Sequence, residues 1–412
     1  MVPVILGVLA LLACNVSALP TALPVQALPT PSPVVTAASP SPSAAPATAT
    51  PAARAFDPVR FKQDLDPAVA AFLAPNNVPG CAVALVYPDP ASAKLLTQTF
   101  SYGLTSKATQ RPVTAATLFE IGSLSKLFAA DLLALNVTHN QMALDDPLQK
   151  YLPATVHVPT YNQKVITLGE LATHTSGLPR TDGQPSVRKV KGVAFFGYAT
   201  DDELFGFLNA YQLTAPPGQK WLYSNLANAL LGIAEERVGQ GSFDSLVVNQ
   251  ISGPLGLSDT RGAPTAAEQP DMAQGYLPDG QPAPAFDEDS AEVAAGGLHA
   301  TAKDLAAYLV ANMDPANTPL AQVLQMTQQR QTFGPKPGVS MGLGWLIANP
   351  GAPAEQFSKD GATAGFNAYI TFSRVNHTGF AVVCNGHNVT QMLAPQIAKF
   401  LGAAEIEVAD TP

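Results

Sequence analysis

Two hydrophobic periods alternate along this chain, and their order predicts its architecture. Short apolar runs bounded by turn residues predict β-strands near both ends of the folded sequence. Longer segments with apolar residues three to four positions apart predict helices between them. The strands are expected at 83–87, 95–102, 342–348, 356–359, 366–372 and 379–385. The helices are expected at 61–73, 123–135, 201–213, 226–238 and 391–401, with a short one ending at 152 and another opening at the cap residue Thr301.

This order of elements predicts an α/β fold of the α+β type. Strands at both chain ends imply an antiparallel sheet built from the two ends and flanked by helices, with a mainly helical lobe inserted into it. The part of the chain that follows residue 55 is longer than the size at which one core keeps growing. We therefore expect two lobes, an α/β lobe from 56–118 plus 296–412 and a helical lobe from 119–295.

The first 55 residues follow neither period. They contain no Asp, Glu or Lys, and residues 2–14 resemble the apolar core of an export signal that is too short to span a bilayer. We expect an export signal over 1–18, and Leu11-Leu12-Ala13-Cys14 resembles a lipobox that would place a lipid anchor at Cys14. The alternative is a plain signal peptide cut near Ala18. Residues 19–55 are mostly Pro, Ala, Ser and Thr, which predicts a disordered tether on a periplasmic or cell-envelope protein.

Charge and cysteine content narrow the class of protein. The formal net charge is −9 without any basic run, which argues against a nucleic-acid partner. Cys81 and Cys384 lie in apolar, strand-like runs, so we expect small buried hydrophobes, or a cross-strand disulfide if the two strands pair. The six histidines are scattered without a metal-binding spacing, so no metal or cofactor is expected. The sequence does not determine the oligomeric state.

The candidate chemistry begins at Ser123, where a glycine turn leads into an apolar helix. Lys126 stands three residues later, on the same face of the first helical turn. A serine hydroxyl needs a neighbouring base, and a lysine in a partly desolvated pocket can be the neutral amine that takes its proton. The unpaired N–H groups at a helix start favour negative charge forming at Ser123. This one stretch therefore predicts a nucleophile, a base and part of an oxyanion site.

Two later stretches contain further candidates. Tyr223 and Asn225 lie at a turn that leads into a buried apolar helix. His174 invites a catalytic interpretation, but a structural histidine at a helix end is favoured because the serine and lysine already supply a base. Ser176 lacks the Gly-x-Ser-x-Gly elbow of the α/β-hydrolases.

Three motifs together, Ser123-x-x-Lys126, Tyr223-x-Asn225 and Lys359-Asp360-Gly361, resemble those of the penicillin-recognising serine hydrolases. The Tyr-x-Asn form is similar to the class C β-lactamase and D-alanyl-D-alanine carboxypeptidase branch. The similarity runs in the family order through nearly all of residues 56–400. It implies an active site between the two lobes and an acyl-enzyme mechanism without cofactor.

The resemblance also implies a role for each matching residue. Ser123 would attack a carbonyl with the help of Lys126, while Tyr223 would carry protons to the leaving amine and from water. Asn225 would bind the substrate's acyl amide and Lys126. The backbone N–H groups of Ser123 and Ala362 would form the oxyanion hole. Lys359, beside Gly361, would attract the substrate carboxylate. Asn162, which aligns only loosely with the family, would contact the substrate.

One position departs from the family pattern. The family carries Thr or Ser where this chain has Asp360, and that hydroxyl helps to bind the substrate carboxylate. A second carboxylate would repel the substrate unless Asp360 turns away or pairs with Lys359. We expect a peptidoglycan D-alanyl-D-alanine carboxypeptidase or endopeptidase. The alternatives are a class C-like β-lactamase, a carboxylesterase acting on neutral or cationic donors, and a non-catalytic penicillin-binding sensor.

Overall fold

The computed structural model describes residues 56–92, 94–181, 200–286 and 289–401, and only the backbone of 188–190 and 193–195. These residues belong to one compact unit, Ala55–Pro412. The predicted export signal, the tether and the lipid-anchor position Cys14 lie outside the described residues. The division of the unit into two lobes stays a prediction.

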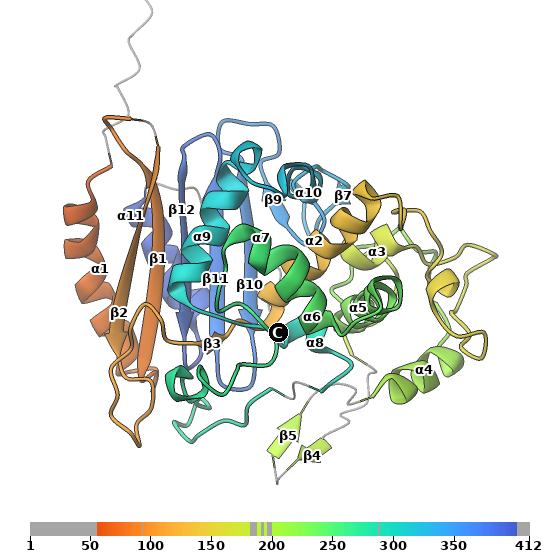
Figure 1. Ribbon diagram of the computed structural model, residues 1–412, viewed down its shortest axis with the longest axis horizontal. Helices are drawn as coiled ribbons and strands as arrows, with labels where there is room; N and C mark the ends of the chain where they lie inside the picture. Colours follow the sequence, from red (N-terminus) through yellow and green to blue (C-terminus); the bar gives the residue numbers. More distant parts are fainter. Residues whose placement is uncertain are drawn as a thin grey trace, which may run out of the picture. The chain divides into compact units, whose positions relative to one another are not determined.

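Eight antiparallel strands form the central sheet, in the order β2-β1-β12-β11-β10-β9-β8-β7 (Figure 1). The sheet therefore joins strands from both chain ends, as the sequence predicts. The strands are β1 Gly80–Pro88, β2 Leu95–Gly103, β7 Thr332–Phe333, β8 Val339–Met341, β9 Leu346–Ala348, β10 Gln356–Ala362, β11 Asn367–Ser373 and β12 Thr378–Cys384. Two small sheets pair β3 Phe119–Glu120 with β6 His299–Ala300, and β4 Arg188–Val190 with β5 Val193–Phe195.

Most predicted helices are present, with corrected ends. The α-helices are α1 Pro58–Leu73, α2 Ser125–Thr138, α3 Leu168–Ala172, α4 Asp201–Ala210, α5 Asn225–Gly239, α6 Phe243–Val247, α7 Gly253–Leu255, α8 Val293–Gly296, α9 Ala302–Met313, α10 Ala321–Thr327 and α11 Ala394–Phe400. Shorter 3₁₀ or π turns are η1 Gly122–Leu124, η2 Leu148–Tyr151, η3 Val248–Ser252, η4 Gln269–Asp271, η5 Pro315–Asn317 and η6 Val389–Leu393. The Thr301 hydroxyl caps α9 by accepting from the Asp304 N–H, which confirms the predicted cap.

Three predicted boundaries were wrong. The single strand predicted at 342–348 begins only at Leu346, because Gly344 turns the chain at φ +74°. The helix predicted to end at 213 ends at Ala210, since Tyr211 becomes extended and its hydroxyl donates to the Gly177 carbonyl. The last predicted helix divides into η6 and α11.

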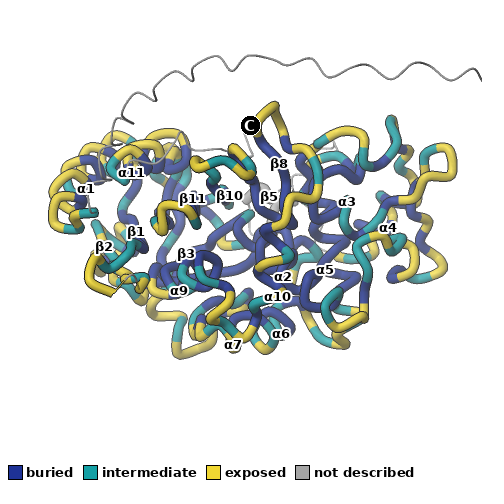
Figure 2. The backbone as a smooth tube through the Cα atoms, turned by 90° about the horizontal axis from the view of Figure 1, so that it is seen from above, coloured by how far each residue is buried: buried dark blue, intermediate teal, exposed yellow. Residues whose placement is uncertain are grey.

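Helices cover both faces of the sheet. Along β1, Cys81, Val83 and Leu85 pack with α1 and α11 in one core cluster. Ala82, Ala84 and Val86 belong to the second cluster, which contains α2, α5 and α9. Because successive side chains on a strand point to opposite faces, β1 is buried on both sides and reads as a continuous apolar run (Figure 2).

The two strand cysteines form a disulfide. Cys81 lies directly opposite Cys384 in the antiparallel pair β1–β12, and their sulfurs are bonded. Of the two expectations, the cross-strand disulfide between paired strands is confirmed, and both cysteines are buried. The bond closes a loop between residues 303 positions apart and joins the two chain ends that build the sheet. None of the helices in the described ranges is both long and apolar enough to cross a membrane.

Candidate active site

The candidate nucleophile stands where β3 ends and α2 begins. Gly122 adopts φ +53°, and a Cβ at that position would lie 2.5 Å from the Ala362 nitrogen. Only glycine allows this close turn, which presents Ser123 half-buried at the start of η1. Ser125 fixes the same turn, because its hydroxyl donates to the Gly122 carbonyl at 2.7 Å. The local sequence thus places η1, which contains Ser123, against β10, and β10 lies beside α2 in Figure 1.

Lys126 lies fully buried beside the serine. Its Nζ is 3.0 Å from Ser123 Oγ, 2.9 Å from Asn225 Oδ1 and 2.5 Å from the Ala295 carbonyl oxygen. Burial lowers the pKa of Lys126 below its ordinary value, and Lys359 adds to this lowering while Tyr223 opposes it. The predicted convergence of Ser123, Lys126 and Asn225 is thus present in the structure, and the Ala295 carbonyl joins it.

Tyr223 completes the group around the serine. Its hydroxyl donates to Ser123 Oγ at 2.7 Å. Three basic side chains lie around its ring, with Lys126 Nζ 5.0 Å, Lys359 Nζ 4.9 Å and Arg180 Cζ 5.1 Å from the ring centroid. Burial raises the pKa of Tyr223, but Lys126 and Lys359 outweigh it, so the net direction is downward. The phenol is therefore poised to lose its proton more easily than an ordinary tyrosine.

The third motif lies on β10 with its lysine buried. Lys359 Nζ is 3.5 Å from Asp360 Oδ1, so the carboxylate that replaces the Thr or Ser of the family motif pairs with the neighbouring lysine. Of the two arrangements considered from the sequence, this is the pairing one. Asp360 also acts on Tyr223, because its negative charge raises the pKa of the phenol. Gly361 is required by packing, since a Cβ there would lie 2.1 Å from the Ile121 carbonyl oxygen and 3.0 Å from the Ser123 nitrogen.

The two backbone groups proposed for the oxyanion hole lie in the same contact. Gly122 touches Ala362, and Gly361 touches the nitrogen of Ser123. The loop before α2 and the end of β10 are thus pressed together at two glycines. This packing brings the Ser123 and Ala362 nitrogens to the same edge of the site.

His174 has the structural role that the sequence favours. Its Nδ1 accepts from the Ser224 N–H at 3.2 Å, and its ring lies 4.4 Å from the Tyr223 ring. Burial lowers its pKa well below the ordinary value, and the surrounding cations add to this effect. A neutral His174 therefore supports the loop that holds Tyr223.

Asn162 has a local reason for its position. It is exposed and occupies a two-residue turn with Gln163, where both residues have positive φ and Tyr161 pairs with Lys164. Asparagine tolerates this conformation. Its contact with substrate stays a prediction.

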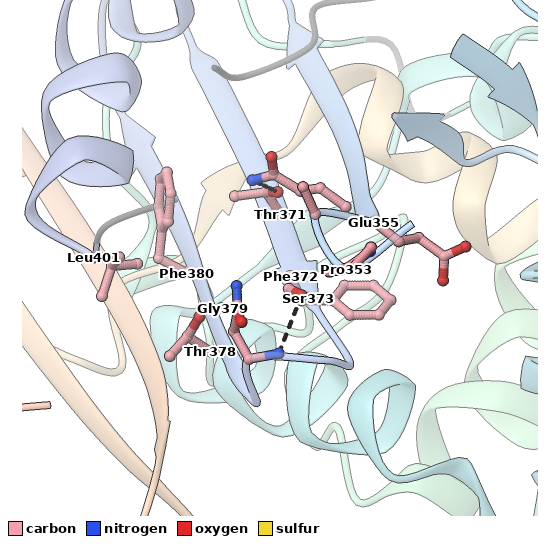
Figure 3. Close-up of a pocket in the computed structure, with 12 residues that line it drawn as sticks. Pro353, Glu355, Thr371, Phe372, Ser373, Thr378, Gly379, Phe380 and Leu401 are labelled. Atoms are coloured by element: carbon pink, nitrogen blue, oxygen red, sulfur yellow. Dashed lines mark hydrogen bonds between the residues drawn. The ribbon is translucent and has the colours of Figure 1, made fainter. Parts of the chain in front are cut away.

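The site is separate from a cavity at the other end of β10. That cavity has a volume of about 380 Å³ and is lined by Gln356, Thr371, Phe372, Phe380 and Leu401 among others (Figure 3). It contains none of the candidate residues.

The described part of the chain holds no group of three or more His, Cys, Asp or Glu side chains arranged for a metal ion.

Sequence reasoning missed two participants. The Ala295 carbonyl is a backbone group, so no residue type marks it. Arg180 ends the run that begins at His174, and its charge after an apolar Gly-Leu-Pro turn is the one signal that could have singled it out.

Comparisons with known proteins show the family of the chain. The family model described as Beta-lactamase matches residues 40–400. The D-alanyl-D-alanine-carboxypeptidase/endopeptidase AmpH of Escherichia coli K12 is 30% identical over 304 residues, covering 71% of this chain and 77% of that protein. A β-lactamase of Pseudomonas fluorescens is 27% identical over 358 residues, covering 79% of this chain and 93% of that protein. A β-lactamase of Escherichia coli K12 is 26% identical over 350 residues.

Proposed function

The chain belongs to the β-lactamase family of serine hydrolases, and from this premise we propose that it cleaves D-alanyl-D-alanine-type peptides through an acyl-enzyme on Ser123. One observation carries the proposal: Ser123 Oγ lies 3.0 Å from Lys126 Nζ and 2.7 Å from the Tyr223 hydroxyl. A nucleophile between two groups that can exchange a proton is the arrangement that covalent catalysis requires. The AmpH relative supports a carboxypeptidase or endopeptidase over other acyl-transfer enzymes of the fold.

The hydrogen bonds of Lys126 support its use as the base. Asn225 Oδ1 and the Ala295 oxygen accept two N–H bonds from Nζ, so the third position of a neutral amine faces Ser123 Oγ. Its lone pair then accepts the Oγ–H. Moving one proton from Tyr223 to Lys126 gives the alternative arrangement, an ammonium beside a phenolate, with the same number of protons. The lowered pKa values of both groups favour sharing this proton between them.

The reaction then proceeds in two balanced steps. Ser123 Oγ bonds to the substrate carbonyl carbon as its proton passes to the Lys126–Tyr223 pair, and the Ser123 and Ala362 N–H groups bind the oxyanion. The peptide C–N bond breaks as Tyr223 delivers the proton to the leaving amine. Water attacks the ester, giving one proton to Tyr223, and Ser123 recovers its proton as the acid departs.

The testing experiment is the intact mass of residues 56–412 after incubation with a penicillin. A persistent adduct on wild type that is lost in Ser123→Ala supports a slowly deacylating peptidase. Consumption of penicillin without a persistent adduct supports the β-lactamase named among the relatives. If penicillin forms no adduct and is not consumed, the peptidase proposal is overturned and an esterase is favoured. An esterase would hydrolyse short-chain esters without cleaving D-alanyl-D-alanine.

Asp360 provides a second, independent test. If its carboxylate excludes carboxylate-bearing β-lactams, Asp360→Thr raises their turnover, because the repulsion is removed and a hydroxyl donor is restored. An unchanged turnover contradicts this account of Asp360. The peptidase proposal is unaffected, since it rests on Ser123.

We also propose that the protein is exported to the periplasm or cell envelope. The disulfide between Cys81 and Cys384 supports an oxidising compartment, because such bonds are rare in reducing cytosol. The apolar segment 2–14 supports an export signal. Cell fractionation of the full chain and of Cys14→Ala tests both points. A cytosolic, reduced protein contradicts export, and loss of membrane attachment in the variant identifies the lipid anchor.

A further inference from the structure

The peptide groups on the two sides of Tyr223 are both bound by one residue. The Leu222 N–H donates to the His174 carbonyl at 2.7 Å, and the Ser224 N–H donates to His174 Nδ1 at 3.2 Å. The imidazole ring also lies against the Tyr223 ring, with 4.4 Å between the two centroids. His174 therefore contacts Tyr223 and both of its neighbours in the chain.

His174 occupies a backbone position where its residue type is unusual. The helix α3 ends in a Schellman motif, in which the Thr175 N–H donates to the Glu170 carbonyl at 2.9 Å. The second bond of the motif runs from the His174 N–H to the Leu171 carbonyl at 3.4 Å. His174 is the left-handed residue of this motif, with φ +58°, where glycine or asparagine is usual. A buried imidazole at this position indicates a function that glycine would not supply.

Nδ1 of His174 is the acceptor that fixes the peptide between Tyr223 and Ser224. Ser224 is fully buried, so its N–H would have no water to bind if Nδ1 were removed. That peptide would then have to turn toward another acceptor, and Tyr223 would turn with it. Because a backbone N–H can only donate, Nδ1 carries no proton and the imidazole is neutral. Burial lowers the pKa of the ring well below its ordinary value, and three basic side chains add to this effect: Lys359, Lys126 and Arg180.

We propose that His174 is a positioning residue of the reaction, whose acceptor nitrogen holds the Tyr223 hydroxyl against Ser123. This inference rests on the acyl-enzyme route proposed above, in which Tyr223 exchanges protons during attack on Ser123 and its release. His174 acts through the peptide next to Tyr223 and takes no proton itself. A reacting group displaced by about 1 Å can cost roughly 10²-fold in rate, so one hydrogen bond to the backbone is important for the chemistry.

A histidine that only fills space makes a different prediction. Its substitutions would lower the stability of the fold, but the rate constant of each folded molecule would not change. Two substitutions separate this role from positioning. His174→Phe keeps a ring beside Tyr223 and removes the acceptor. His174→Asn tolerates the left-handed backbone and places an accepting oxygen, Oδ1, close to where Nδ1 lies.

The experiment measures acylation of the full-length chain by rapid mixing with a chromogenic short-chain ester, over a range of pH. We expect His174→Phe to lower the acylation rate constant about 10–100-fold, with the dissociation constant of the ester within about threefold. The acidic limb of its pH–rate profile should move to higher pH, because a displaced Tyr223 loses part of the influence of Lys126 and Lys359, which lower its pKa. His174→Asn should acylate within about threefold of wild type and keep the wild-type limb.

His377→Phe is the matched control. His377 also has a positive φ, +50°, but lies exposed in the turn between β11 and β12. Its substitution should leave the acylation rate constant and the pH–rate profile unchanged. Thermal unfolding of each variant shows whether it is folded.

Two results would overturn the positioning role of His174. One is a folded His174→Phe that acylates within about threefold of wild type. The other is a folded His174→Asn that acylates more than about tenfold slower than wild type, and this result decides the question even where His174→Phe does not fold. A wild type that is acylated by the ester but does not cleave D-alanyl-D-alanine contradicts the peptidase function alone, because the ester still tests His174.

Discussion

Gly361 tests whether the packing of β10 against the serine loop builds the oxyanion hole. We consider Gly361→Ala, which adds one methyl group. Its carbon would lie 2.1 Å from the Ile121 oxygen and 3.0 Å from the Ser123 nitrogen. A carbon–oxygen contact needs about 3.3 Å, so β10 and the serine loop must separate by roughly 1 Å. The separation moves the Ala362 and Ser123 N–H groups apart at the place where the oxyanion would form.

The expected magnitude follows from this displacement. Loss of one oxyanion donor costs about 10²–10³ in rate, equivalent to ~2.7–4 kcal/mol of transition-state stabilisation. We expect the acylation rate constant of Gly361→Ala to fall by this factor. Overpacking also costs about 1–3 kcal/mol of folding stability, so the melting temperature should fall by several degrees.

The assay is rapid-mixing acylation with a chromogenic ester or β-lactam, accompanied by thermal unfolding. Gly206→Ala is the matched control, because a Cβ there meets nothing within 4 Å inside α4. It should leave acylation unchanged and add about 0.5–1 kcal/mol of stability. A folded Gly361→Ala that acylates within about threefold of wild type would refute the oxyanion assignment.

Three further predictions follow from the same structure. Replacing both Cys81 and Cys384 by Ala should lower stability by about 2–5 kcal/mol, measured by denaturant unfolding; wild type in reductant should show a similar loss, and an unchanged midpoint would contradict a stabilising bond. Lys359→Met should move the acidic limb of the pH–rate profile to higher pH, because Lys359 lowers the pKa values of both Lys126 and Tyr223; a limb that stays in place refutes the coupling. Burial raises the pKa of Asp131 to about 7, so folding binds its proton and stability is lost as pH rises from about 4 to 7; Asp131→Asn should flatten this slope, by up to about 4 kcal/mol at neutral pH, and an unchanged slope would show that other groups cause it.

Much of the fold could be predicted from the sequence because its signals are local. The strand at 83–87 and the helix after Asn225 each carry their own apolar period. The disulfide is different, because it depends on the register that sets Cys81 opposite Cys384 across 303 positions, and no local pattern contains that register. The same limit explains the corrected end of α4, where the contact between the Tyr211 hydroxyl and the Gly177 carbonyl overrides the apolar period.

The candidate site, like the fold, could be predicted only in part from the sequence. Ser123, Lys126, Tyr223 and Asn225 were predictable as residue types in a known order, and the structure brings them together. The Ala295 carbonyl was not predictable, because every residue has a carbonyl and only its placement by α8 distinguishes this one.

Asp360 shows why a visible departure from a motif still needs a structure. The sequence left two arrangements open for Asp360, one turned away and one paired with Lys359, and the alternation of side chains along a strand does not by itself predict the pairing. The long lysine stem instead brings Nζ to 3.5 Å from the carboxylate. The carboxylate therefore opposes Lys359 twice, by competing for its charge and by raising the pKa of Tyr223. A peptidase with this pair has a weakened anion site on β10, because the charge that would attract a substrate carboxylate is partly neutralised by Asp360. The turnover of carboxylate-bearing donors by Asp360→Thr therefore measures how far the pairing weakens this site.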